Sequence, residues 1–390
     1  MKTRSPAALP SWLWRLLIAM VLTQVAAFLV RPALTYRALE LGANDLLVGL
    51  LVAIYAFLPA LLAVPLGRYS DRRRPAPVFG FGTILLGVGS AGLAVAESLA
   101  TVAVATVALG LGAMMIMVGA QSIVARVSTE ADLDRDFGLT SAAASIGQML
   151  GPLGTGWMLT GKDNASGTAL AFAVGAGLCA VALAFTFAYP DRPGPSSSTD
   201  APPRWMETVA ILRIPSVPGA MTASIALLAT VDLLVAYLPL IGERVGISPG
   251  VVGILLSLRA AASVSSRILL AVLTRRFSRT GLITTSTFVT ALLVPAIAFT
   301  SNPWLLGALL VVLGFFLGLG QPLTMTLITT AVPARSRGAA LAIRMLGNKA
   351  GQVAVPAAIA AATAAVGVGG GFVLLGAVLA AATLGASRAR

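Results

Sequence analysis

Residues 67–75 read GRYSDRRRP, a short basic stretch that separates two long hydrophobic runs. Five of its nine residues are charged, in a chain that is only 11% charged. One run ends at Leu66 and the next begins near Ala76. A polar segment this short cannot fold alone, so we interpret it as the connection between two hydrophobic helices.

The composition is that of a membrane protein. The 390 residues are 57% hydrophobic and the mean hydropathy is +0.92. A helix needs about 20 apolar residues to cross the hydrocarbon core of a bilayer. Splitting the chain at charges and turn-forming residues predicts twelve such spans: 12–38, 46–66, 76–97, 101–125, 137–160, 167–189, 216–240, 249–273, 281–301, 304–328, 339–362 and 367–386.

The spans form two groups of six. Residues 190–215 begin with a stretch rich in proline, serine and glycine, which favours a flexible linker. The predicted bundles are therefore residues 1–189 and 216–390. They also repeat, because four residues recur at an offset of exactly 200 positions: Gln121, Gly138, Gly147 and Gly151 match Gln321, Gly338, Gly347 and Gly351. Parallel six-span repeats place a substrate path at their interface.

The distribution of lysine and arginine predicts the orientation. If the N-terminus is cytoplasmic, 19 of the 27 basic residues fall in cytoplasmic segments and three in external loops. The positive-inside rule then places both termini in the cytoplasm, in a multi-pass protein of the plasma or inner membrane. This pattern also explains the net charge of +13 without a nucleic-acid partner.

Several kinds of chemistry are excluded by composition. The chain has no histidine, so Ser-His-Asp and Cys-His catalysis and histidine-metal sites are not possible. Cys179 is the only cysteine, which rules out an intrachain disulfide. No Walker A sequence occurs, and the G-x-G-x-x-G at 87–92 lies within a span rather than after a strand. We expect neither an enzyme nor a protein that holds a metal or cofactor.

The segment at 67–75 resembles the signature loop of the major facilitator superfamily, G-x-x-x-D-[RK]-x-G-[RK]-[RK]. Gly67, Asp71 and Arg72 match, and Arg73 and Arg74 stand for the closing basic pair, while the x-G before that pair is missing. The resemblance implies a twelve-helix, all-α fold in two halves and a cytoplasmic gate at these five residues. The alternative is that the arginines only anchor the loop on the cytoplasmic side.

The span at 137–160 contains GQMLGPLGTG at 147–156, which resembles the antiporter motif of the same family. Gly147, Gly151, Pro152 and Gly156 match, and Thr155 replaces a glycine. The resemblance implies export. The alternative is close helix packing, since small residues four apart let helices approach each other.

Charges inside spans carry the most functional information, because each costs a few kcal/mol at the bilayer centre unless it is paired or hydrated. Asp232 is the only acid well inside a span, and we expect it to carry the coupling proton. The resemblance implies that the first and seventh spans face each other across the cavity, so that Asp232 pairs with Arg31 or Arg259. Arg31, Arg259 and Arg344 are candidate substrate groups, whereas Arg267 is close enough to the cytoplasmic end to snorkel. Lys349 is the remaining basic residue within a span.

Gln121 and Gln321 occupy equivalent places in spans that line the cavity of this family, and could bind substrate or bridge helices. The predicted function is proton-coupled efflux of a small organic compound, anionic or amphipathic, by a monomer in contact with membrane lipids. One alternative is uptake or facilitated passage of an organic anion or sugar. Another is a membrane sensor or lipid-binding protein that transports nothing.

Overall fold

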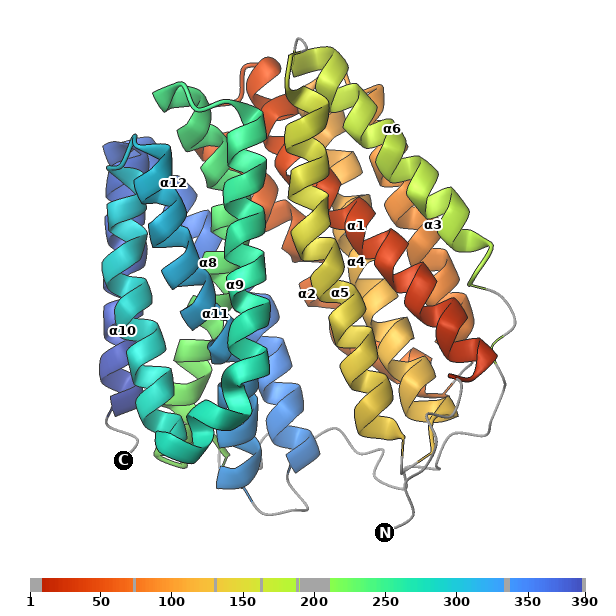
Figure 1. Ribbon diagram of the computed structural model, residues 1–390, viewed down its shortest axis with the longest axis vertical. Coiled ribbons are helices and arrows are strands. Elements are labelled where there is room, and N and C mark those ends of the chain that lie inside the picture. The colour runs from red at the N-terminus through yellow and green to blue at the C-terminus, as the bar shows by residue number, and fades with distance from the viewer. Residues whose placement is uncertain are drawn as a thin grey trace.

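Every regular element of the described chain is a helix. The computed structural model describes residues 9–72, 75–129, 132–161, 164–186, 189, 211–332 and 337–387, at some positions by the backbone only. Figure 1 shows the helices as two side-by-side groups. They are α1 (Ser11–Glu40), α2 (Asp45–Arg72), α3 (Pro75–Ala94), α4 (Leu99–Val127), α5 (Leu133–Leu159), α6 (Asn164–Leu183), α8 (Ser216–Val245), α9 (Pro249–Arg276), α10 (Arg279–Ala298), α11 (Pro303–Ala331) and α12 (Arg337–Ser387).

The last helix consists of two segments. Its 51 residues would reach about 77 Å as one straight helix, more than twice the hydrocarbon thickness of a bilayer. Gly367 interrupts it, with φ 75° and ψ 173°. By length and composition, ten helices in the described residues could cross a membrane, with α12 counted once and α5 not among them. The all-α membrane fold is confirmed, and the count of twelve spans stays a prediction.

The basic stretch at 67–75 is not the loop that the sequence suggested. Helix α2 continues to Arg72, and Pro75 already begins α3. Hydropathy marks where a helix leaves the apolar core, but arginine, tyrosine and serine can continue a helix into water. Proline is favoured in the first turn of a helix, where its missing N–H needs no partner.

The two halves, α1–α6 and α8–α12, repeat the same packing. Helix α5 packs against α1, where a Cβ on Gly151 would lie 2.5 Å from the carbonyl carbon of Phe28. The matching glycine of the second half, Gly351, faces Ile225 on α8. Helix α1 begins and α12 ends at the same end of the bundle, which we call the terminal end (Figure 1). The predicted boundary at 190–215 lies largely outside the described residues and stays a prediction.

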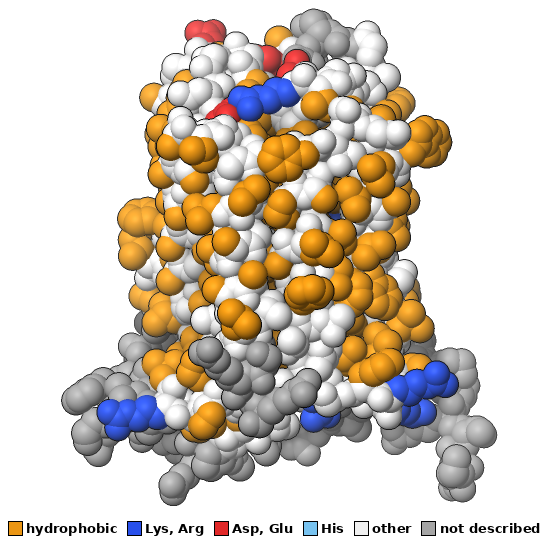
Figure 2. All heavy atoms as spheres, turned by 90° about the vertical axis from the view of Figure 1, so that its left-hand side faces the viewer, with side chains coloured by type: hydrophobic (Ala, Val, Ile, Leu, Met, Phe, Trp, Pro, Cys, Tyr) orange, Lys and Arg blue, Asp and Glu red, His pale blue; other side chains and the backbone are white. Residues whose placement is uncertain are grey.

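The outer surface suits a bilayer. Large hydrophobic side chains are exposed along the helices, including Trp157, Val104 and Ile268, each about three-quarters exposed. Figure 2 shows hydrophobic side chains over the middle of one face, with charged side chains near both ends. A multi-pass integral membrane protein accounts for such a surface, because lipid covers the apolar middle.

Candidate functional site

The centre of the site is an ion pair between the first helices of the two halves. Arg31 on α1 binds Asp232 on α8, with 2.6 Å between Nη2 and Oδ1. The two side chains are only 13% and 11% exposed. This is one of the two pairings expected for Asp232. Arg31 and Asp232 stand 201 positions apart, so they occupy nearly equivalent places in the two repeats.

Further side chains that sequence reasoning did not select complete this cluster. Gln352 on α12 donates from Nε2 to the second oxygen of Asp232 at 2.6 Å. Its own oxygen accepts from Nζ of Lys349 at 2.9 Å. The guanidinium of Arg31 also lies over the ring of Tyr55, 4.8 Å from the centroid. Residues three apart share a helix face, so the Lys349–Gln352 spacing was the available signal.

Arg259 is buried near this cluster without a matching acid. It is 2% exposed, and its Nε has no hydrogen-bond partner. The charge of Arg31 repels Arg259 and that of Asp232 attracts it. Among the described residues, no acid lies within ion-pair distance of Arg259. Arg267, further along α9, is exposed, and its snorkelling stays a prediction. The centre of the protein therefore carries more positive than negative charge.

Arg344 is held by neutral oxygens instead of by the central cluster. Its Nη2 donates to the side-chain and main-chain oxygens of Gln321 at 2.6 and 3.1 Å, and to the hydroxyl of Thr324 at 3.2 Å. Gln321 in turn donates to the carbonyl of Ser224. Gln121, its counterpart in the repeat, is exposed. The structure thus separates two glutamines that the sequence treats as equivalent.

The antiporter-like motif lies on packed surfaces. A Cβ on Gly147 would collide with Gln24 of α1, and one on Gly156 would lie 2.8 Å from the carbonyl oxygen of Pro249 in α9. Thr155 donates its hydroxyl to the carbonyl of Leu29. Pro152 is inside α5, and its carbonyl faces Gly253. These residues bring α5 close to α1 and also to the other half.

The halves meet at the end of the bundle opposite the terminal end. Asp45 at the start of α2 forms an ion pair with Arg244 near the end of α8, and its carbonyl accepts from the Tyr237 hydroxyl at 3.2 Å. Ser257 on α9 donates to the carbonyl of Met149 on α5 at 2.7 Å. Figure 1 shows the ribbons of the two groups diverging toward the terminal end. The protein is therefore closed at one end by contacts between its halves.

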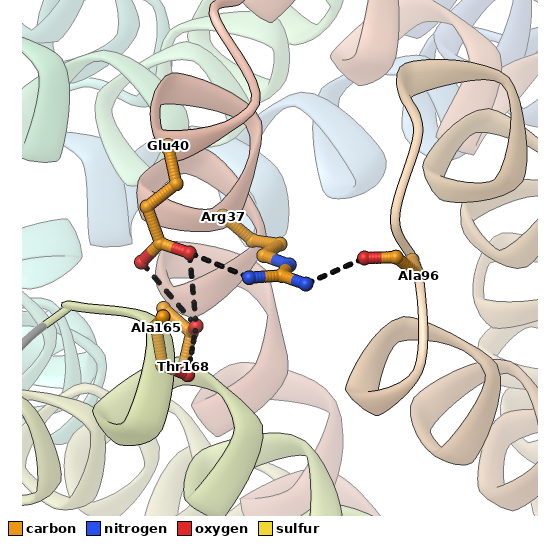
Figure 3. Close-up of polar contacts among 5 residues, drawn as sticks. All are labelled: Arg37, Glu40, Ala96, Ala165 and Thr168. Atoms are coloured by element: carbon orange, nitrogen blue, oxygen red, sulfur yellow. Dashed lines mark hydrogen bonds and ion pairs between the residues drawn. The ribbon is translucent and has the colours of Figure 1, made fainter.

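A second polar cluster connects segments of the first half at the closed end. Figure 3 shows Arg37, near the end of α1, between Glu40 and the connection that follows α3. Arg37 binds Glu40 at 2.9 Å and donates to the carbonyl of Ala96 at 2.6 Å. Thr168 at the start of α6 reaches Glu40 at 3.4 Å. This cluster connects α1, α6 and the segment after α3 within one half.

Two hollows lie along this closed end. The one beside Arg31, Thr35 and Tyr55 has a volume of about 20 Å³, room for little more than one water molecule. The other has a volume of about 350 Å³ and is lined by Asp45 and Arg244 among others. Of these two hollows, only the smaller is lined by Arg31.

The predicted cytoplasmic gate cannot be assessed in the same way. Arg73 and Arg74 lie outside the described residues, and Gly67, Asp71 and Arg72 are described by their helical backbone only. The gating role of these residues stays a prediction.

Comparison with known proteins agrees with this architecture. A curated relative, the inner membrane transport protein YajR of Escherichia coli (strain K12), is 30% identical over 139 residues, which cover 35% of this chain and 29% of the relative. The chain thus matches less than a third of that protein's length.

Solved structures show the same fold at low identity. A bacterial homologue of the human lysosomal transporter Spinster, in an inward-facing and occupied conformation, is similar with a TM-score of 0.74 and 16% identity, covering 98% of this chain and 97% of that one. The nucleoside transporter NupG gives 0.76 and 13%, covering 97% and 99%. A D-xylose-proton symporter gives 0.74 and 15%, covering 96% and 97%.

The family model of the Major Facilitator Superfamily matches residues 16–244 and 220–388, which together include nearly the whole chain. Its members are secondary active transporters and not enzymes. The two repeated half-bundles and the ion pair between their first helices fit a transporter of this kind. The chain belongs to the Major Facilitator Superfamily.

Proposed function

We propose that this transporter exports a small organic compound in exchange for protons, by alternating access of two six-span halves. Both termini lie in the cytoplasm and the protein resides in the plasma or inner membrane. With that orientation, the closed end of the bundle is the outer end, and the conformation is inward-facing.

The observation that carries the proposal is the ion pair between Arg31 and Asp232. It joins two helices that must separate when the outer end opens, since each belongs to a different half. An ionised carboxylate inside a bilayer requires a cationic partner or water. Loss of Arg31 therefore favours protonation of Asp232 from outside, and its return on closure favours release of the proton inside.

The export direction is supported by the motif in α5. Gly147, Gly151, Pro152 and Gly156 resemble the antiporter motif, and they form the surfaces along which α5 contacts α1 and α9. A helix that packs closely on both halves is well placed to govern how they move against each other. The direction itself is a proposal.

Proteoliposomes with an imposed pH gradient provide the test. Wild-type protein should accumulate substrate on the acidic side, because protons leave that side in exchange, and Asp232→Asn should retain exchange but lose accumulation. Asp45→Asn is the matched control, because it removes an acid from a second ion pair between the halves. Undiminished gradient-driven accumulation by Asp232→Asn would overturn the coupling role.

Proton-coupled uptake of an organic anion is a second candidate. It is favoured by the excess of positive charge around Asp232, where Arg259 has no acid partner among the described residues and Lys349 is held by an amide. An anion bound near these cations is repelled by ionised Asp232. Substrate and proton would then favour each other's binding, which is the behaviour of a symporter.

The two candidates differ in a measurable sign. In an exporter that exchanges protons for substrate, lowering the pH should weaken substrate binding, whereas in an anion symporter it should strengthen it. Binding of each hit from a metabolite panel, measured at two pH values with its neutral amide analogue as control, separates them. Flux in oriented vesicles then gives the direction.

A further inference from the structure

Asp232 has one partner in each half of the protein. One oxygen binds Arg31 of the N-terminal half, and the other accepts from Gln352 on α12, which belongs to the same half as Asp232. Gln352 does not stand alone, because Lys349 donates to its oxygen. The carboxylate is therefore linked to two cations, one directly and one through an amide.

The orientation of the amide follows from the lysine. An ammonium group can only donate, so it must face the oxygen of Gln352. The NH₂ group of the same amide is then directed to the carboxylate. The positive charge of Lys349 also polarises the amide, which strengthens the bond that the amide donates to Asp232.

The geometry points to Lys349 as the second cationic partner of Asp232, which acts through Gln352 and stabilises the carboxylate after Arg31 has moved away with the other half, until a proton arrives from outside. This inference rests on the proposed alternating access of the two halves. Helices α8 and α12 pack along each other within one half, so Asp232, Gln352 and Lys349 move together. An ionised acid inside the membrane needs a cation or water, and a cation in the same half stays beside Asp232 in every conformation.

The other charged or titratable groups near Asp232 do not serve this role equally well. Tyr55 and Arg31 belong to the half that moves away. Arg259 is in the same half, on α9, but its Nε is without a hydrogen bond and it forms no ion pair with Asp232. Arg344 is engaged with Gln321 and Thr324. Lys349 is the basic group that reaches the acid through a continuous chain of hydrogen bonds.

Distance measurements between spin labels can test the inference without a known substrate. Labels at Glu97 and Ser301 report opening of the outer end, because both residues are exposed and follow α3 and α10, one in each half. Cys179 is replaced by alanine to avoid a third label. The full chain is studied in lipid nanodiscs at neutral pH, in an Arg244→Gln background that weakens the outer ion pair and populates the open state.

Lys349→Met should lower the ratio of outer-open to outer-closed molecules by roughly tenfold or more, since opening would leave Asp232 without a cation. Gln352→Leu should act in the same direction, and Lys349→Arg should restore the ratio. Asn348→Ala is the matched control: its side chain is buried one position away and binds Ser224.

The decisive comparison uses Asp232→Asn. In that background the carboxylate is absent, so Lys349→Met should no longer change the ratio. An equal effect with and without Asp232 would show a structural role for the lysine and overturn the inference, as would an unchanged ratio in Lys349→Met alone. Coupled flux by Asp232→Asn would instead contradict the proposed function. The comparison of Lys349→Met with and without Asp232 would still test the role of the lysine.

Discussion

In the N-terminal half, α5 packs against α1 through Gly147 and Gly151, and in the C-terminal half α12 packs against α8 through Gly347 and Gly351. The backbones thus repeat, but the side chains do not. Arg344, Lys349 and Gln352 of α12 correspond, at the offset of 200, to Ala144, Met149 and Pro152 of α5.

This difference separates the requirements of the fold from those of transport. Glycines four residues apart are needed in both halves, because two helices must approach closely in each. Under the proposed function, charges are needed only where protons or substrate bind, so one half can supply them. The C-terminal half therefore carries Asp232 and its polar neighbours, and the N-terminal half contributes Arg31 as the charged partner.

The strongest test of this asymmetry is the central ion pair. Asp232→Leu should destabilise the protein by about 3–5 kcal/mol, because it leaves Arg31 buried near Arg259 with no acid. Arg31→Met should cost clearly less, since Asp232 keeps Gln352 and, through it, Lys349. Chemical unfolding in detergent micelles gives both free energies. A larger loss from Arg31→Met would contradict the assignment of the polar partners to the C-terminal half.

The repeated glycines allow a sharper comparison of packing. Gly151→Ala should cost about 1–3 kcal/mol, because the new Cβ meets backbone atoms of Phe28 and Leu29 that cannot rotate away. Gly351→Ala should cost less, since only the side chain of Ile225 must move. Unfolding free energies of the two variants, measured side by side, test this difference. Equal costs would mean that the two interfaces are equally rigid.

The two repeat-related glutamines should respond differently to the same change. Gln321→Ala should cost about 1–3 kcal/mol, because Arg344 and the Ser224 carbonyl each lose a buried partner. Gln121→Ala should stay within about 0.5 kcal/mol, as expected for an exposed side chain. Thermal and chemical unfolding provide the measurement. A comparable loss at Gln121 would reveal a contact equivalent to that of Gln321.

A small effect is also expected where the halves touch at the closed end. Arg244 is half exposed, so Arg244→Gln should change the unfolding free energy by about 1 kcal/mol or less. The change should shrink further in high salt, which screens exposed charges. Unfolding at low and high ionic strength checks both expectations. A large effect that is insensitive to salt would indicate a buried role for this pair.

Much of the architecture was predictable because it depends on local properties of the chain. Apolar runs of the right length predicted membrane helices, and the constant register of the glycines predicted two similar halves. Span limits were less accurate at the ends, as α2 shows by continuing to Arg72. Hydropathy reports the depth of a residue in the membrane, while helix ends depend on backbone hydrogen bonds.

The candidate site was only partly predictable. Asp232 and Arg31 stood out because charges are rare inside spans, and their pairing was one of two possibilities. Gln352 did not stand out, because a neutral amide gives no signal in a charge pattern. Arg344 binds the oxygens of Gln321 and Thr324, contacts that the charge pattern did not indicate, and its role as a substrate group stays a prediction.

The sequence by itself determined that the chain crosses a membrane repeatedly, in two related halves, with a single acid deep inside a span. These properties follow from composition and spacing along the chain, which do not depend on which residues are neighbours in space. Only the tertiary structure decided that Arg31 is the partner of Asp232 and that Gln352 links Asp232 to Lys349 by hydrogen bonds. It also decided that Gln121 is exposed whereas Gln321 binds Arg344. Contacts between helices far apart in the chain depend on how each helix is rotated and packed, and periodicity alone does not specify that.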